Sequence, residues 1–190
     1  MNNKYYKDNL NSFIDSTINC DMSDQYKLFE KYLNNNTKTI LDIGFGSGRD
    51  SIYFSQKYEV YSIDPVEDFC ELAKQKGLKN VVCMNVQDLD YQDKFDGIWA
   101  CASLLHIPSN EILDVFNRCY NALTSNGIMY CSFKYGEYEG ERNGRFFNDF
   151  TLEKLNKVLS NTKFKVLEST ITNDVRVDRT EQWLNVVLGK

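Results

Sequence analysis

The chain has 190 residues, of which 42% are hydrophobic, and this is enough apolar material for the core of one globular domain. Its formal net charge is -5, with charged residues spread along the chain, so there is no basic stripe for a nucleic-acid backbone. No apolar run approaches the roughly 20 residues that span a bilayer, and no signal-peptide pattern opens the chain, so we expect a cytoplasmic protein without membrane contacts. Six cysteines without a CxxC pair and a single histidine predict no metal site.

Strand-like and helix-like segments alternate along most of the chain. Runs rich in β-branched and aromatic residues occur at 38–44, 59–65, 80–86, 95–103, 127–133, 164–171 and 182–188. Helical spacing occurs at 23–33, 50–57, 66–75, 110–123 and 151–159. The first five strands fit parallel right-handed crossovers, whereas the last two are joined without helical periodicity. We therefore expect an α/β fold with a seven-stranded, mostly parallel sheet, helices on both faces and a C-terminal antiparallel hairpin.

The turn after the first expected strand reads LDIGFGSGRD, with three glycines in five positions. Gly44 and Gly46 can adopt backbone angles that side chains forbid, and Gly48 permits close packing of the helix and a ligand. In such sheets ligands bind at the carboxyl end of this strand, where the next helix offers free N–H groups. A dinucleotide motif, GxGxxG, would need glycine where the chain has Arg49. An NAD-dependent oxidoreductase is therefore the less favoured alternative.

The spacing Asp42-x-Gly44-x-Gly46-x-Gly48 resembles the first motif of the class I S-adenosylmethionine-dependent methyltransferases, an acidic residue followed by GxGxG. Purely structural turns use glycine as well, which is the alternative interpretation of this motif. The stretches GSGRDSIYF and YEVYSIDP are similar to compact bacterial enzymes of the tellurite-resistance methyltransferase type. The resemblance covers essentially the whole chain. It implies S-adenosylmethionine as cofactor and one domain over 1–190, with a helical lid at 1–36 and a Rossmann-like core at 37–190.

An acidic residue at the end of the second strand supports an adenosine cofactor. Asp64 lies about 20 residues beyond Gly44, where a carboxylate can accept hydrogen bonds from both ribose hydroxyls. NAD enzymes use the same arrangement, and a simple strand-end turn before Pro65 is the other alternative. The resemblance also assigns Asp88 to the adenine amino group, although a turn cap would explain this residue too.

The resemblance adds backbone contacts at the third and fourth strands. It places the Leu89 backbone against an adenine ring nitrogen, and Ala100 and Cys101 beneath the methionine part of the cofactor. The complete set of expected cofactor-binding residues is Asp42, Gly44, Phe45, Gly46, Gly48, Asp64, Pro65, Asp88, Leu89, Ala100 and Cys101.

Methyl transfer from a sulfonium is a direct displacement, so the protein needs no covalent nucleophile. His106, the only histidine, follows the fourth strand and could deprotonate or position an acceptor; a structural hydrogen bond is the alternative. Many relatives carry a double histidine here, whereas this chain has Leu105 at the first position. Tyr135 is a second catalytic candidate.

The segment SFKYGEYEGERNGRFFNDF, after the fifth strand, corresponds to a loop that commonly lines the acceptor site in this family. Arg142 and Arg145 could grip an anionic acceptor, joined by Arg176 or Arg179, although a solvated loop with internal salt bridges would look the same. Phe13 and two tyrosines of the lid could form an aromatic wall or pack against the sheet. The expected substrate-binding residues are Tyr5, Tyr6, Lys134, Arg142 and Arg145.

These patterns together predict a cytoplasmic methyltransferase acting on a small molecule. A tRNA or rRNA methyltransferase is disfavoured by the acidic composition and by the lack of an RNA-binding appendage. A non-catalytic sensor of S-adenosylmethionine, or a partner subunit of another methyltransferase, would carry the same cofactor motifs.

Overall fold

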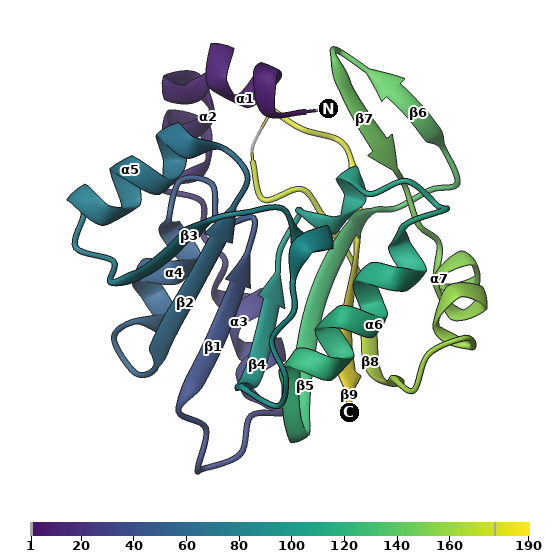
Figure 1. Ribbon diagram of the computed structural model, residues 1–190. Helices are drawn as coiled ribbons and strands as arrows, with labels where there is room; N and C mark the ends of the chain where they lie inside the picture. The colour runs from purple at the N-terminus through teal and green to yellow at the C-terminus, as the bar shows by residue number, and fades with distance from the viewer. Residues whose placement is uncertain (1, 177) are drawn as a thin grey trace.

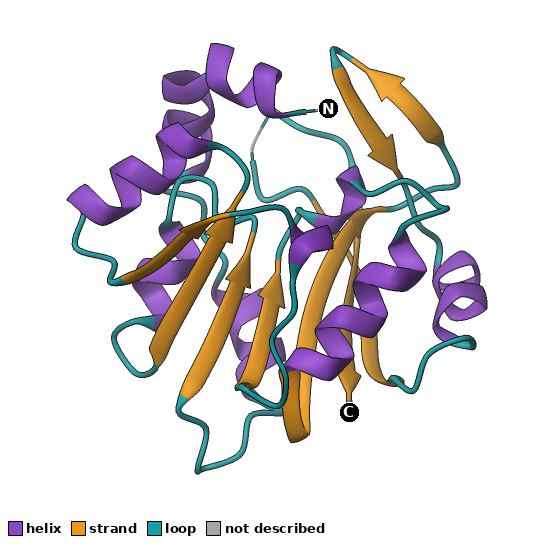
Figure 2. Ribbon diagram, in the orientation of Figure 1, coloured by secondary structure: helices purple, strands orange, loops and turns teal. Residues whose placement is uncertain are grey.

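The computed structural model describes residues 2–176 and 178–190. Its central sheet crosses the middle of the molecule with helices on both faces (Figures 1 and 2). The strands of this sheet are β1 (Thr39–Ile43), β2 (Glu59–Asp64), β3 (Asn80–Cys83), β4 (Phe95–Ala100), β5 (Leu123–Lys134), β8 (Lys165–Asn173) and β9 (Gln182–Gly189). They lie in the order β3-β2-β1-β4-β5-β9-β8.

The direction of the strands confirms the predicted fold class. Neighbours among β1 to β5 run parallel, whereas β9 runs antiparallel to both β5 and β8. Four of the five residues of β1 are buried, because the strand is covered on both faces. This burial explains why the central strands appear in the sequence as apolar runs.

Two apolar clusters lie on opposite faces of the sheet. One contains Phe116 of α6 (Ile112–Ala122) and Leu155 of α7 (Leu152–Leu159). The other contains Phe29 of α3 (Ser23–Glu30) and Phe54 of α4 (Arg49–Phe54). A third cluster forms around Phe69 of α5 (Glu67–Gln75), at the β3 edge. Together the clusters fix both helix layers against the strands.

The amino-terminal region divides into two parts with different roles. The helices α1 (Asn3–Asp8) and α2 (Leu10–Thr17) lie above the carboxyl ends of β1 and β2 (Figure 1). In contrast, α3 belongs to the core, since Phe29 is fully buried against the sheet. The segment predicted as a helical lid at 1–36 therefore covers the sheet end only through α1 and α2. Among the described residues, no helix has the length and apolarity needed to cross a bilayer.

A second, two-stranded sheet occupies the segment that was expected to be a loop. Its strands are β6 (Glu139–Arg142) and β7 (Arg145–Asn148), which pair in antiparallel fashion. Asn143 and Gly144 connect them with φ angles of 51° and 75°. Positive φ at both central residues is typical of a two-residue hairpin turn with an Asn-Gly sequence. This hairpin projects beyond the main sheet on the side of α7 (Figure 2).

Candidate functional site

A cavity of about 320 Å³ lies at the carboxyl ends of the central strands. The strand order reverses between β1 and β4, and such a reversal leaves a crevice at the sheet edge. Gly44 follows β1 and Ser103 follows β4, and both line this cavity. Tyr6 of α1 and Phe13 of α2 complete the wall from above. Strand ends and lid helices therefore enclose one site.

The glycine turn has the backbone geometry that the sequence predicts. Gly44 and Gly46 have φ angles of +70° and +51°, which side chains rarely adopt. A Cβ on Gly44 would lie 2.5 Å from Ser103 Cβ, and one on Gly46 would lie 2.9 Å from the Phe13 ring. Gly44, Phe45 and Gly46 line the cavity, whereas Gly48 lies outside its wall. Glycine is thus required at positions 44 and 46, both by the backbone angle and by the protein atoms that lie where a Cβ would be.

Asp64 ends β2 and joins the glycine turn to the start of α5. Its side chain accepts hydrogen bonds from the N–H groups of Gly46 (3.0 Å) and Val66 (2.9 Å). Burial raises the pKa of Asp64 to about 6, against the opposing effect of these two hydrogen bonds. Asp64 and Pro65 both line the cavity. The sheet therefore presents a buried carboxylate to this end of the site.

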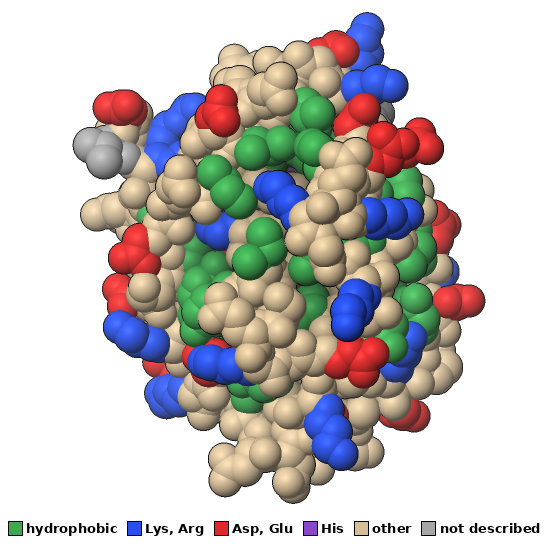
Figure 3. Space-filling view, turned by 90° about the vertical axis from the view of Figure 1, so that its left-hand side faces the viewer, with side chains coloured by type: hydrophobic (Ala, Val, Ile, Leu, Met, Phe, Trp, Pro, Cys, Tyr) green, Lys and Arg blue, Asp and Glu red, His purple; other side chains and the backbone are tan. Residues whose placement is uncertain are grey.

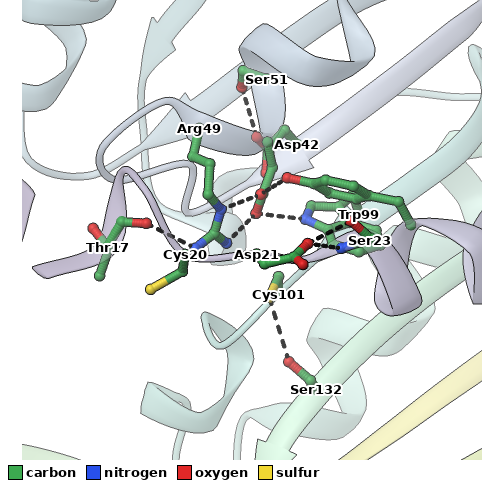
Figure 4. A network of polar contacts seen from close by, with 12 residues as sticks. Thr17, Cys20, Asp21, Ser23, Asp42, Arg49, Ser51, Trp99, Cys101 and Ser132 are labelled. Atoms are coloured by element: carbon green, nitrogen blue, oxygen red, sulfur yellow. Dashed lines mark hydrogen bonds and ion pairs between the residues drawn. The ribbon is translucent and has the colours of Figure 1, made fainter. Parts of the chain in front are cut away.

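Asp42 is placed below the turn and outside the cavity wall. Its carboxylate accepts a hydrogen bond from Ser51 Oγ at 2.6 Å (Figure 4). The Ser51 hydroxyl in turn lies 2.8 Å from the hydroxyl of Ser62. Burial first, and then the charge of Asp50, raise the pKa of Asp42. This residue of the glycine motif connects β1 to α4, so its contacts are structural.

A buried ion pair at the start of α4 forms another wall of the cavity. Arg49 donates to the Asp50 carboxylate through Nε (2.6 Å) and Nη2 (2.9 Å), and through Nη1 to the Thr17 carbonyl (3.1 Å) (Figure 4). Asp50 also accepts from Trp99 Nε1 at 2.9 Å and from the Tyr26 hydroxyl at 2.5 Å. In the sequence, Arg49 only argues against a dinucleotide motif. Adjacent opposite charges at the start of a helix were the available signal for this network.

Besides Asp42 and Gly48, three further residues that were expected to contact the cofactor lie outside the cavity wall. Asp88 is exposed and accepts a hydrogen bond from Asn85 Nδ2 at 3.1 Å. Leu89 and Ala100 are buried in the apolar core. The segment from Met84 to Gln87 lines this part of the cavity instead, and Cys101 lines it after β4.

His106 and Tyr6 form a hydrogen-bonded pair inside the cavity. His106 Nδ1 lies 2.7 Å from the Phe146 carbonyl oxygen, which can only accept, so Nδ1 carries the proton. The unprotonated Nε2 then accepts from the Tyr6 hydroxyl at 2.8 Å. Burial lowers the pKa of His106 to about 4, and the charges of Arg145 and Lys134 act in the same direction. The imidazole is therefore neutral near pH 7.

Two of the basic residues predicted to bind substrate line the cavity. Lys134 Nζ is paired with Glu181 at 2.7 Å. The guanidinium of Arg145 lies 4.4 Å from the ring centroid of Tyr5, and its Nη1 lies 3.5 Å from the Tyr6 hydroxyl. Tyr5 thus stacks on Arg145 from outside the cavity wall.

The other two candidates of this region lie away from the cavity. Arg142 forms an ion pair with Asp149 and stacks on the ring of Tyr138. Tyr135 is exposed, next to its backbone pairing with Phe150. The structure therefore brings Arg145 and Lys134 together with His106, but leaves Arg142 and Tyr135 outside.

Comparisons with known proteins agree with this arrangement. Residues 40–127 match the family described as "Methyltransferase domain". Over 103 residues the chain is 28% identical to alpha N-terminal protein methyltransferase 1 of Dictyostelium discoideum, covering 50% of this chain and 38% of that protein. Over 166 residues it is 25% identical to phosphoethanolamine N-methyltransferase of Plasmodium falciparum, covering 80% of this chain and 59% of that protein. The chain thus spans less than two thirds of the length of either relative.

A solved structure shares the fold over nearly the whole chain. The 1,6-didemethyltoxoflavin-N1-methyltransferase of Burkholderia thailandensis, with bound 1,6-didemethyltoxoflavin and S-adenosylhomocysteine, superposes with a TM-score of 0.80 at 23% identity. The match covers 98% of this chain and 84% of that structure. The sheet is therefore the Rossmann-like sheet of the class I methyltransferase fold. Residues 40–127 thus resemble a methyltransferase domain, and the chain as a whole has the fold of S-adenosylmethionine-dependent methyltransferases. The narrower similarity to the tellurite-resistance type is not confirmed.

Proposed function

We propose that this protein transfers a methyl group from S-adenosylmethionine to a small-molecule acceptor by direct displacement. The observation that carries the proposal is the continuity of one cavity. Its wall includes both the glycine turn with Asp64 and the hydrogen-bonded pair of Tyr6 and His106. Direct displacement needs both reactants held close and in line within such an enclosed space.

The cavity wall suits a nucleoside with an amino-acid tail. The buried Asp64 carboxylate can accept hydroxyl donors, and the turn from Gly44 to Gly46 offers backbone polar groups. The Ser103 hydroxyl is buried and has no hydrogen-bond partner among the described residues, so it is available to a ligand. When bound, S-adenosylmethionine supplies the activated methyl group. The roles assigned to Asp88, Leu89, Ala100 and Cys101 stay predictions.

Tyr6 and His106 can move a proton away from the acceptor. If the Tyr6 oxygen accepts a proton from the acceptor, its own proton can pass along the existing hydrogen bond to His106 Nε2. The bond from Nδ1–H to the Phe146 carbonyl holds the ring in the orientation that this transfer needs. Because the pKa of His106 is about 4, the proton resides there only briefly. The pair therefore suits an acceptor that becomes acidic as it is methylated.

A small acceptor is favoured over a nucleic acid. Helices α1 and α2 cover the cavity, and on the face shown in Figure 3 basic side chains are mixed with acidic ones without forming a continuous patch. A nucleic-acid site normally shows a basic surface. Two of the relatives carry names with small acceptors, phosphoethanolamine and 1,6-didemethyltoxoflavin, and both cover most of this chain. A cytoplasmic location stays a prediction.

Calorimetric titration with S-adenosylhomocysteine tests the cofactor assignment. Gly46→Val should weaken binding at least about tenfold, because its Cβ meets the Phe13 ring and its φ is positive. Gly77→Val is the matched control, since Gly77 has φ +89°, has open space around its Cβ position and lies outside the cavity. A wild-type protein that fails to bind this nucleoside contradicts the proposal. Labelled donor incubated with separate metabolite and RNA fractions then tests the acceptor class.

The pH dependence of the same titration tests Asp64. A carboxylate accepts two hydroxyl hydrogen bonds, whereas a protonated acid does so less well, so affinity should rise as pH is raised through about 6. Asp64→Asn should lose this rise and bind more weakly by about 1 to 2 kcal/mol. An unchanged affinity in the variant would remove Asp64 from the cofactor site.

A further inference from the structure

The cavity wall contains more positive than negative side chains. Its basic residues are Arg49, Lys134, Arg145, Arg176 and Arg179, and its acidic residues are Asp50, Asp64, Asp174 and Glu181. Three pairs form within the wall at 2.6 to 2.7 Å: Arg49 with Asp50, Lys134 with Glu181, and Arg176 with Asp174. Among the described residues, Arg145, Arg179 and the carboxylate of Asp64 form no ion pair in this wall.

Arg145 takes no part in the ion pairs found among residues 2–176 and 178–190. Its Nε is buried and has no hydrogen-bond partner within that part of the chain. Besides the 3.5 Å contact with the Tyr6 hydroxyl, its neighbours are the faces of Tyr5 and Phe147, at 4.4 and 5.0 Å from their centroids. Aromatic faces hold a cation in place but leave its in-plane donors unused. Arg145 is half-buried, and a partly desolvated guanidinium without a counter-charge gains from a ligand that supplies one.

We propose that the methyl acceptor carries an anionic group, a carboxylate or a phosphate ester, that pairs with Arg145. This inference rests on the proposed function, because it names the substrate class of the same site. The planar fork of a guanidinium matches both anions with two parallel hydrogen bonds. Arg179 is exposed on the same wall and adds attraction as the anion enters.

The position of Arg145 also orients the acceptor. Its Nη1 faces the Tyr6 hydroxyl, which contacts His106 Nε2. An anion bound to Arg145 therefore anchors the acceptor one side chain away from the pair that handles its proton. The aromatic rings of Tyr6 and Phe147 line the space beside it, so the rest of the acceptor meets an apolar wall.

The test compares three probes of similar shape on protein saturated with S-adenosylhomocysteine. Benzoate and phenyl phosphate carry the two anions, and benzamide is the neutral counterpart of benzoate. Binding is measured by calorimetry on the wild type, on Arg145→Gln and on Arg118→Gln. Arg118 lies on α6, outside the cavity, and pairs with Asp114 on the surface. It serves as the matched control for loss of an arginine.

We expect the wild type to bind at least one anion about tenfold more tightly than benzamide, and Arg145→Gln to lose this preference. Arg118→Gln should keep it, and all three proteins should bind S-adenosylhomocysteine alike. Equal binding of benzamide and both anions by the wild type, or a preference that survives in Arg145→Gln, overturns the inference. A loss of S-adenosylhomocysteine binding in Arg145→Gln also overturns it, because Arg145 would then hold the cofactor. Failure of the wild type to bind that nucleoside contradicts the proposed function instead.

Discussion

Arg49 and Arg145 line the same cavity but have opposite surroundings. Arg49 uses Nε, Nη1 and Nη2 in hydrogen bonds to protein oxygens, and its partner Asp50 is held from two further sides. Within the part of the chain that the structure describes, Arg145 has only a long contact with the Tyr6 hydroxyl and contacts with the faces of aromatic rings. A guanidinium that the chain satisfies stabilises the fold, whereas one that the chain leaves unsatisfied is available to a ligand. Arginine in a cavity wall therefore indicates recognition only after its internal partners are known.

The largest expected effect concerns the satisfied arginine. Asp50→Ala leaves Arg49 buried without its carboxylate and removes the acceptor for Trp99 and Tyr26. Breaking such a pair from one side typically costs about 3 to 5 kcal/mol. Urea unfolding at pH 7 measures this loss. Asp114→Ala, which breaks the exposed pair with Arg118, is the control and should leave the midpoint unchanged. Similar midpoints for both variants would show that the Arg49 network is not stabilising.

An intermediate effect on stability is expected from the titration of His106, which lies near Arg145 and Lys134. Burial, with Arg145 and Lys134, lowers the pKa of His106 from 6.5 to about 4. A lowered pKa in the folded state means that the unfolded chain binds the proton first, so stability is lost as pH falls from 6.5 toward 4. By pH 4.5 this loss is about 2 to 3 kcal/mol.

His106→Gln isolates that contribution. The variant lacks the titrating group, so the stability difference between wild type and variant should move in favour of the variant by this amount between pH 7 and pH 4.5. The raised pKa of Asp64 has the opposite effect, but it is present in both proteins and cancels in the difference. Urea unfolding curves of both proteins at the two pH values measure this change in the stability difference. If the stability difference between wild type and His106→Gln is the same at both pH values, the pKa of His106 is not lowered by folding.

The smallest effect is expected for the unsatisfied arginine. Arg145→Met removes favourable contacts with aromatic faces, each about 0.5 to 1 kcal/mol, but also removes a half-buried charge. We therefore expect the free energy of unfolding to change by no more than about 1 kcal/mol. Urea unfolding beside Asp50→Ala gives the direct comparison. A loss as large as that of Asp50→Ala would mean that the protein itself satisfies Arg145.

The sequence was sufficient to predict the strands of the main sheet and the place of the candidate site at the end of β1. Runs with β-branched residues marked each main strand, and the central strands such as β1 are the most apolar because they are covered on both faces. The glycine spacing from Gly44 marked the strand end at which the cavity opens. Only local patterns were needed for these two results.

Contacts between distant segments could not be predicted in the same way. Tyr6 and His106 are 100 residues apart, and no periodicity links them. Neither could a sequence pattern show that Asp42 holds a helix rather than facing the cavity. The hairpin of β6 and β7 is different, since its Asn143-Gly144 pair is a local hairpin signal that is visible in the sequence.

The placement of the two tryptophans gives the molecule its own optical reporter. Trp99 is fully buried, with its indole N–H bonded to Asp50, so its emission should be insensitive to added quenchers. Trp183 is only partly buried, lies in the cavity wall and donates to Asp174 at 3.1 Å. Iodide quenching addresses this indole selectively, and a bound molecule shields it, so occupancy can be followed by fluorescence without a label.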